Sequence, residues 1–494
     1  MNILLVYPEI PDTFWSFKYA LKFIGKKVAF PPLGLLTVAA LLPEQWPKRL
    51  VDLNIHRLKD SDIRWADYVL LSGMTVQRDS AREVIRRANA LGVPVIAGGP
   101  LFTTEHENFS GVAHFVLNEA EITMPLFLDD LRRGVPQPLY RTDKFADINA
   151  TPMPLWHLAK LRKYATMSVQ YSRGCPFQCE FCNVTSLFGH RPRVKSPKQI
   201  IAELDYLKQL GWKGKVFFVD DNLIGNKHHL MRELLPTLID WQRTGGRMPF
   251  FTEASINLAD DPHLMEMMRD AGFESVFVGI ETPSEESLTE CSKKQNIGRD
   301  LIADIKRIQR AGLEVQGGFI VGFDSDTSNI FQRQIDFIQK SGIVVAMVGL
   351  LQAVQGTRLH ERLKNEGRLI GCTSGDNVDG TTNIVTRMDA KQLLDGYKKI
   401  LNSIYSPKNY YARSKTFLRE YRLPKVRESL SVRRLGALVR SIFYIGIFGQ
   451  ERFHYWKLMI WTLFMRPQLM PQTVTMAIYG VHFRAVCRSQ NKSN

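Results

Sequence analysis

Three cysteines, Cys175, Cys179 and Cys182, lie within eight residues of a chain that contains six cysteines in all. Their spacing is C-x3-C-x2-C, in the segment YSRGCPFQCEFCNV. Thiolates are soft ligands that suit zinc and iron–sulfur clusters. A structural zinc site usually has four protein ligands. This loop offers three, so a four-iron cluster held here would keep one iron open to a substrate or cofactor. A zinc site completed by His190 is the alternative.

The other cysteines and the N-terminus indicate the compartment. Cys291, Cys372 and Cys487 stand alone, and six cysteines in 494 residues are too few for a disulfide framework. We therefore expect a reducing cytoplasm, where clustered cysteines indicate metal or redox chemistry. The opening residues MNILLVYPEI have no basic leader or cleavage site, so they predict a first strand instead of a signal peptide.

The cysteine loop follows the first strand of a β/α series. Short apolar runs predict its later strands, and amphipathic stretches at 196–211 and 261–272 predict helices between them. Six parallel strands predict a partial (β/α)6 barrel, in which active sites gather at the carboxyl ends of the strands. The five strands expected after the loop are 215–221, 249–255, 275–281, 314–323 and 344–353.

A second α/β series precedes the barrel. Strands are expected at 2–8, 68–75, 93–100 and 114–121, with helices at 33–43 and 78–92, which is typical of a doubly wound, Rossmann-like sheet. Residues 133–154 are rich in Pro, Asp and Thr and predict a linker. An amphipathic stretch at 389–405 begins a mainly helical, basic region. The expected domains are 1–140, a linker at 141–165, the barrel at 166–365 and a helical domain at 366–494.

The motif GCPFQCEFC resembles that of the radical S-adenosylmethionine (SAM) superfamily. The resemblance implies a [4Fe-4S] cluster on Cys175, Cys179 and Cys182, whose open iron chelates the amino and carboxylate groups of SAM. An electron from the reduced cluster would then cleave SAM to a 5′-deoxyadenosyl radical. Such a radical can take hydrogen from an unactivated carbon.

Polar residues at later strand ends fall where the superfamily contacts SAM. Asp220, Asp221 and Asn222 occupy the place of its usual Gly-Gly-Glu and could accept hydrogen bonds from the SAM amine. These residues and those named next also have a plainer interpretation, in which the polar residues are a solvated strand end and the glycines mark a β-bulge. The other expected contacts are Glu253 and Ser255 for the ribose or carboxylate, then Gly279 and Glu281, and the later glycines Gly317, Gly318 and Gly322.

A doubly wound domain before a radical SAM barrel resembles the cobalamin-binding subfamily. Ligands of such folds lie at the carboxyl ends of the strands, and small residues there would let a corrin approach the backbone. No G-x-G-x-x-G follows the first strand, which disfavours a dinucleotide. The residues expected to contact cobalamin are Ser72, Gly73, Met74 and Thr75; Gly98, Gly99 and Pro100; and Asn118 and Glu119.

The D-x-H-x-x-G motif that supplies an axial histidine in many cobalamin enzymes is absent. The closest segment, Asp52–His56, has the wrong spacing, so we expect His56 to be a surface residue. The lower face of the cobalt would then meet Met74 or a water molecule. A weakly ligated cobalt suits methyl transfer to a carbon radical.

The last fifth of the chain carries most of its charge. From Ser406 onward there are 16 Lys and Arg and three Asp and Glu, a net +13 of the +16 total. This segment could contact an anionic membrane surface, or its apolar residues could pack on the barrel with the charges solvated. No transmembrane helix is expected, and we expect no nucleic-acid partner.

The three-part layout resembles the group of the hopanoid C-2 methylase, and the segments Leu350–Leu369 and AIYGVHF fit that group. The resemblance implies transfer of a methyl group from methylcobalamin to an unactivated carbon of a small-molecule or lipid substrate such as a hopanoid. Flavodoxin or ferredoxin would supply electrons. Two alternatives stay open, a cobalamin enzyme that cyclises or rearranges without methyl transfer, and an iron–sulfur or cobalamin sensor that binds nucleic acid. The enzyme is expected in the cytoplasm, with peripheral membrane contact as a further expectation.

Overall fold

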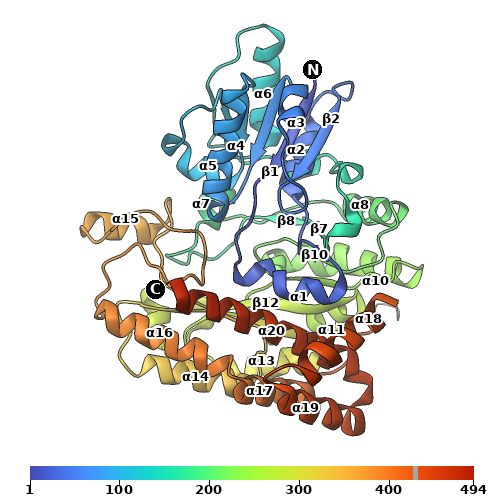
Figure 1. Cartoon of the computed structure of the whole chain (residues 1–494), viewed down its shortest axis with the longest axis vertical. Coiled ribbons are helices and arrows are strands. Elements are labelled where there is room, and N and C mark those ends of the chain that lie inside the picture. The colour runs from blue at the N-terminus through green and yellow to red at the C-terminus, as the bar shows by residue number, and fades with distance from the viewer. Residues whose placement is uncertain (427–431, 494) are drawn as a thin grey trace.

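The computed structural model describes residues 1–426 and 432–493. Three parts follow one another down the molecule in Figure 1: an N-terminal α/β unit at the top, a second sheet in the middle, and C-terminal helices below it.

The N-terminal unit is a parallel sheet covered on both faces. Its strand order is β2-β1-β3-β4-β5-β6. One face packs on α2 Leu33–Leu41 and α6 Ala120–Arg132, and the other on α3 Asp60–Trp65, α4 Arg78–Ala90 and α5 Pro100–Glu105. The predicted doubly wound fold is confirmed. The strands are β1 Ile3–Tyr7, β2 Lys48–Asp52, β3 Tyr68–Ser72, β4 Val95–Gly98, β5 His114–Val116 and β6 Leu139–Tyr140.

Two of these strands were not expected from the sequence. β2 and β6 are the edge strands of the sheet, and β6 lies in the Pro-rich stretch predicted as a linker. An edge strand pairs on one side only, so β6 can consist of two residues and β2 can have the partly polar sequence KRLVD, and neither gives a clear strand pattern.

The second sheet is the expected partial barrel. Six parallel strands follow the order β14-β13-β12-β11-β10-β7, with β7 and β14 at its two edges. The strands are β7 Met167–Val169, β10 Val216–Phe218, β11 Phe250–Glu253, β12 Phe273–Glu281, β13 Glu314–Val321 and β14 Ala346–Leu350. The longer helices between them are α8 Pro197–Gln209, α10 Leu235–Arg243, α11 Pro262–Asp270, α13 Leu301–Ala311 and α14 Ile330–Ser341, and the short ones are α7 Val184–Phe188, α9 Lys227–His229 and α12 Glu285–Glu290.

The C-terminal region is helical, as expected, and shares one hydrophobic core with the barrel. Among the described residues, no helix is both long and apolar enough to cross a bilayer. The helices after the last strand are α15 Arg358–Asn365, α16 Ala390–Ile404, α17 Pro407–Glu420, α18 Val432–Ser441, the π-helix η12 Ile442–Ile447, α19 Arg452–Met465 and α20 Met470–Ser493.

The N-terminal segment between β1 and α2 leaves its own sheet and crosses to the barrel (Figure 1). It contains η1 Phe14–Ser16, α1 Lys18–Leu21 and η2 Lys22–Ile24. The Phe14 ring stacks on Phe483 of α20, with centroids 4.4 Å apart, and the Phe14 carbonyl lies 2.9 Å from His482 Nε2. The beginning and the end of the chain are therefore packed together beside the barrel.

Candidate active site

The cysteine loop starts from a short antiparallel pair, β8 Ser172–Arg173 with β9 Arg193–Val194. Gly174 opens the loop with φ +97°, and a Cβ there would lie 2.9 Å from the Gly189 carbonyl oxygen. A left-handed residue with no room for a side chain has to be glycine. The "GC" at the start of the motif is thus a requirement of the backbone.

Backbone contacts hold the three motif cysteines. The amide of Cys175 donates to the Gly189 carbonyl, and the amide of Cys182 donates to the Cys179 carbonyl, both at 3.2 Å. All three thiols are free and half-buried. Gln295 places its Nε2 3.8 Å from Cys179 Sγ. The loop therefore presents three free thiols, and backbone hydrogen bonds hold it in place.

The surroundings of the thiols disfavour their deprotonated form when no metal is bound. Burial raises the pKa of Cys175 above its usual range and that of Cys182 to about 12, and the neighbouring Cys179 adds to both shifts. Because only the thiolate binds a metal, these side chains become ligands when a cationic group replaces their protons.

Asp220, which follows β10, fixes the entry to the loop. Its carboxylate is fully buried and accepts hydrogen bonds from the backbone amides of Tyr171, at 3.2 Å, and Ser172. Burial raises the pKa of Asp220 to about 7. This carboxylate, expected to meet SAM, is engaged in positioning the loop.

Two other carboxyl groups lie beside the thiols. Burial raises the pKa of Asp221 to about 6. It also raises the pKa of Glu253 to about 8, to which the negative charges of Asp221 and Asp220 add. Asn222 accepts from the backbone amide of Ser255 at 3.2 Å and so ties the ends of β10 and β11 together. Buried carboxyl groups whose pKa values are raised would be stabilised in their ionised form by a bound cation.

An ion pair that sequence reasoning missed lies next to the loop. Lys293 Nζ is 2.6 Å from Glu281 Oε1, and both side chains are almost fully buried. Although burial opposes it, the negative charges of Glu281 and Cys179 raise the pKa of Lys293. Gly279 makes room for the pair, since a Cβ there would lie 2.4 Å from Glu281 Oε1. Lys293 stays charged beside the thiols.

In the N-terminal sheet, three strand ends meet at the edge that faces the barrel. β3, β4 and β5 are neighbours, so the expected cobalamin contacts at 72–75, 98–100 and 118–119 share that edge. The backbones are tightly apposed, because a Cβ on Gly99 would lie 2.3 Å from Ser72 Oγ. Met74 is 45% exposed, and His56 is exposed as expected.

Glu119 lines the cavity next to the cysteine loop and also bonds residues of β8 and β9. Its carboxylate lies 3.0 Å from Arg173 and 2.8 Å from Arg193, on β8 and β9. Glu121 adds a second bond to Arg173, at 2.8 Å. Glu119 was expected at the cobalamin site, and its contacts also attach the N-terminal unit to the base of the cysteine loop.

A cavity of about 390 Å³ opens between the N-terminal unit and the barrel. Thr103 and Asn118 line it from the N-terminal unit, and Ser186 and Gln355 line it from the barrel side. Asn118 has φ +62°, and its buried Oδ1 has no hydrogen-bond partner among the described residues. An unsatisfied buried acceptor at the carboxyl end of a parallel sheet fits a ligand that donates a hydrogen bond.

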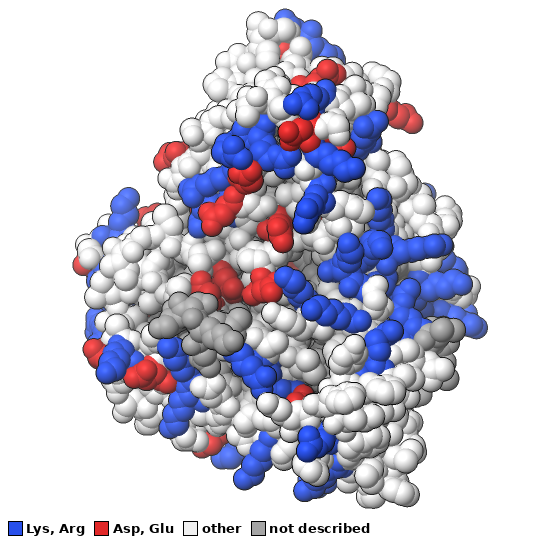
Figure 2. Space-filling model, in the orientation of Figure 1, with Lys and Arg blue, Asp and Glu red and all other residues white. Residues whose placement is uncertain are grey.

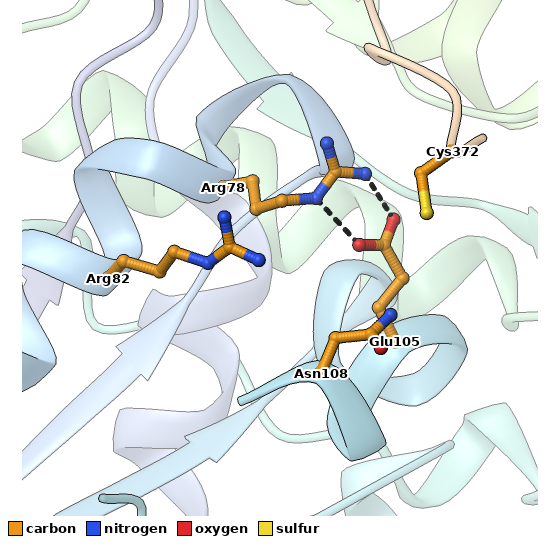
Figure 3. Close-up of a pocket in the computed structure, with 5 residues that line it drawn as sticks. All are labelled: Arg78, Arg82, Glu105, Asn108 and Cys372. Carbon is orange, nitrogen blue, oxygen red and sulfur yellow. Dashed lines mark hydrogen bonds and ion pairs between the residues drawn. The ribbon is translucent and has the colours of Figure 1, made fainter. Parts of the chain in front are cut away.

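A second cavity, of about 340 Å³, contains none of the residues predicted from the sequence (Figure 3). Arg78 forms two 2.7 Å hydrogen bonds to Glu105, and the thiol of Cys372 points toward the same space. Arg78 also donates to the Thr373 carbonyl. Here the segment after α15 closes against the N-terminal unit.

The inner face of the barrel is aromatic. Strand register places Phe217, Phe251 and Phe277 on the same face as Glu253, and all of these side chains are half-buried. The rings of Phe217 and Phe251 stack at 4.7 Å. From the N-terminal segment, Trp15 contacts Phe277 at 5.3 Å between centroids. The catalytic side of the sheet thus continues into a surface of stacked rings.

Three family descriptions match successive parts of the chain. Residues 27–128 match the B12 binding domain and residues 169–338 match the radical SAM superfamily. Residues 357–494 match a domain of unknown function, DUF4070.

Full-length relatives share this arrangement. An uncharacterized methyltransferase of Synechocystis is 39% identical over 98% of this chain and 91% of its own length. The hopanoid C-2 methylase of Rhodopseudomonas palustris is 34% identical over 92% of this chain and 88% of its own length. The chain belongs to the cobalamin-binding radical SAM methyltransferases. Its cofactors are therefore a [4Fe-4S] cluster, SAM and cobalamin.

Solved structures of this kind have the same fold. The radical SAM methyltransferase TsrM of Kitasatospora setae, with cobalamin and a [4Fe-4S] cluster bound, has a TM-score of 0.62 at 14% identity, over 92% of this chain and 98% of its own. The cobalamin-dependent radical SAM enzyme OxsB, with aqua-cobalamin, also has a TM-score of 0.62, at 13% identity, over 100% of this chain and 81% of its own.

The residues present fit the cofactors of the family. Three thiols that bind only after losing their protons, on one loop and beside the Lys293 cation, are a suitable donor set for an iron–sulfur cluster. Within the described residues, no three His, Cys, Asp or Glu side chains come close enough to hold a single metal ion. The residues at the strand ends also fit cobalamin, because Asn118 offers an unsatisfied hydrogen-bond acceptor and the glycines leave the backbone accessible.

Proposed function

We propose that this methyltransferase places a methyl group on an unactivated carbon of a flat, apolar, polycyclic substrate such as a hopanoid. The observation that carries the proposal is the aromatic inner face of the barrel, where Phe217, Phe251 and Phe277 lie on the side of the sheet that also carries Glu253. The relative named hopanoid C-2 methylase supports the same substrate class.

The motif residues would divide the work as follows. Cys175, Cys179 and Cys182 would hold the cluster. Asp221 and Glu253 would meet the positive charge of SAM, because both carboxyl groups are buried and a bound cation would stabilise their ionised forms. When bound, the three cofactors would supply the chemistry: the cluster an electron, SAM a radical able to take hydrogen from an unactivated carbon, and cobalamin a methyl group. Asp220 would hold the loop in place through its backbone hydrogen bonds.

The N-terminal unit, residues 1–140, would hold cobalamin at the edge that faces the barrel. Ser72, Gly73, Gly98 and Gly99 would let the corrin approach the backbone, and Asn118 would accept one of its hydrogen bonds. Residues 141–165 would connect this unit to the barrel at 166–365. A small electron-transfer protein such as flavodoxin or ferredoxin would reduce the cluster.

The aromatic face would bind the substrate by excluding water. Burying one Phe side chain contributes about 1.5–3 kcal/mol, so several rings together suit a hydrocarbon ring system better than a charged substrate. Trp15 would close the barrel over the bound molecule, since its Nε1 is 3.1 Å from Met347 Sδ and its ring lies against Phe277.

The test is turnover by anaerobically purified protein with a hopanoid, SAM, cobalamin and a reductant. We expect a product heavier by one CH₂, together with 5′-deoxyadenosine and S-adenosylhomocysteine. Deoxyadenosine with a product of unchanged or rearranged mass would instead establish radical chemistry without methyl transfer. A methylated product from a charged peptide, with none from the hopanoid, would overturn the substrate class.

Matched variants separate the chemistry from the substrate. Cys175→Ala, Cys179→Ala and Cys182→Ala should each abolish cluster absorbance and SAM cleavage, whereas Cys372→Ala, at an exposed thiol, should leave both unchanged. Phe217→Ser should keep SAM cleavage and raise the KM for the hopanoid by about 10-fold or more. Val135→Ser, at an exposed apolar residue far from the barrel face, is its control.

A further inference from the structure

An apolar surface on the C-terminal helices is exposed to water. Of the 22 large apolar side chains exposed among the described residues, 12 lie between residues 435 and 465. Phe448, Phe453 and Phe464 are each at least 75% exposed. Soluble proteins rarely expose many large apolar side chains in one region unless a partner or a membrane covers them.

Helix α19 is apolar on both of its sides. Leu458 and Met459 are buried against the rest of the domain. Phe453, Ile460 and Phe464 follow the three- and four-residue spacing of a helical face and are exposed. The buried side packs the helix onto the rest of the domain. That packing does not explain why the exposed side is also apolar.

The preceding helices extend the same surface. Leu435, Val439 and Phe443, on α18 and the start of η12, are exposed at four-residue intervals. η12 packs against α19, where Trp456 Nε1 donates to the Gly446 carbonyl at 2.9 Å. The docking surface, defined here as the exposed side of α18, η12, Phe448 and α19, is therefore continuous.

Basic residues accompany the docking surface. Between Arg433 and Arg466 there are six Lys and Arg and one acidic residue, Glu451, which is buried and paired with Arg484. Figure 2 shows Lys and Arg gathered on the right of the molecule, above the mostly white lower right. Arg440 reaches the N-terminal segment, where it donates to the Phe23 carbonyl at 2.8 Å.

We propose that this docking surface binds the protein to an anionic lipid bilayer. Phe, Tyr and Trp interleaved with Lys and Arg on helices that lie flat is the composition of interfacial helices. A second copy of the chain fits less well, because a twofold contact would bring two basic surfaces of the same charge together. The proposal rests on the surface alone and is independent of the substrate.

The experiment is co-sedimentation of the full-length protein with vesicles. One set contains phosphatidylcholine alone, and the other contains phosphatidylcholine and phosphatidylglycerol in equal parts. We expect binding to the anionic vesicles that weakens as salt is added. The paired variant Phe448→Glu with Phe464→Glu should weaken binding by about 100-fold, at about 10-fold per aromatic ring.

The control pair is Leu126→Glu with Ile370→Glu, which adds the same charge at exposed apolar residues far from the docking surface. It should bind vesicles as the unchanged protein does, and SAM cleavage should show that both pairs are folded. The proposal fails if neither vesicle binds, or if the control pair loses binding equally. It also fails if sedimentation equilibrium shows a dimer that the Phe variants dissociate, because the surface would then join two copies.

Discussion

The carboxylate of Glu119 lies 3.0 Å from the guanidinium of Arg173, two residues before the first motif cysteine. Both side chains are nearly inaccessible to water. A contact between the sheet that faces cobalamin and the strand that begins the cluster loop fixes the relative position of the two cofactor sites. Arg193 and Glu121 extend this contact into a four-residue ion-pair network.

Removing one member of that network should be costly. We expect Glu119→Ala to lower the free energy of unfolding by about 3–5 kcal/mol, because it removes the carboxylate that Arg173 and Arg193 share in a buried ion-pair network. Chemical denaturation monitored by circular dichroism measures the change. Glu83→Ala, which breaks the exposed pair with Arg86, should cost much less, because an exposed ion pair contributes little to stability. If the two variants lost equal free energy of unfolding, the buried network would contribute no more to stability than an exposed ion pair.

Gly279 should not tolerate a side chain. Gly279→Ala would push a methyl group against Glu281 Oε1 and Lys293 Nζ, and we expect a loss of about 1–3 kcal/mol of stability together with reduced SAM cleavage. Gly34→Ala is the matched control, since a Cβ on this exposed residue of α2 meets nothing within 4 Å. A fully active Gly279→Ala protein would contradict the role given to the ion pair.

Lys293 should set the potential of the cluster. Replacing it by Met removes a positive charge beside the thiolates, so adding an electron becomes harder and the midpoint potential should fall. A shift on the order of 60 mV corresponds to about 1.4 kcal/mol for one electron. Redox titration followed by electron paramagnetic resonance measures it. Lys294→Met, at the exposed neighbour, should leave the potential unchanged.

His482 should make stability depend on pH. Burial lowers the pKa of His482 to about 4, so the imidazole stays neutral while it bonds the Phe14 carbonyl. The unfolded chain takes up this proton near pH 6.5 and the folded chain only near pH 4. Stability is therefore complete above pH 6.5 and is lost as pH falls toward 4, by about 1.4 kcal/mol per pH unit.

The variant His482→Gln keeps a donor for Phe14 but has no proton to gain. We expect thermal unfolding of the unchanged protein to move to lower temperature between pH 6.5 and pH 5 by more than that of the variant. Parallel curves for the two proteins would remove His482 as the cause.

The sequence allowed the six barrel strands to be predicted because each is a short apolar run followed by a turn signal. The motif cysteines were equally visible, since their spacing is local. The role of Lys293 could not be predicted from the sequence, because only the fold distinguishes Lys293 from its neighbour Lys294. The inner face of Phe217, Phe251 and Phe277 was hidden as well, because strand register decides which side of a sheet a residue takes. Trp15 reaches Met347 across 332 residues, beyond any sequence pattern.

The pairing of Phe14 with Phe483 sets an order of events during synthesis. The N-terminal segment leaves the ribosome long before its partner helix α20, because Phe14 and His482 are 468 residues apart. The ring stack can therefore form only after α20 has been synthesised. Until then this flank of the barrel lacks the contact between Phe14 and Phe483, and a chain truncated before α20 never forms it.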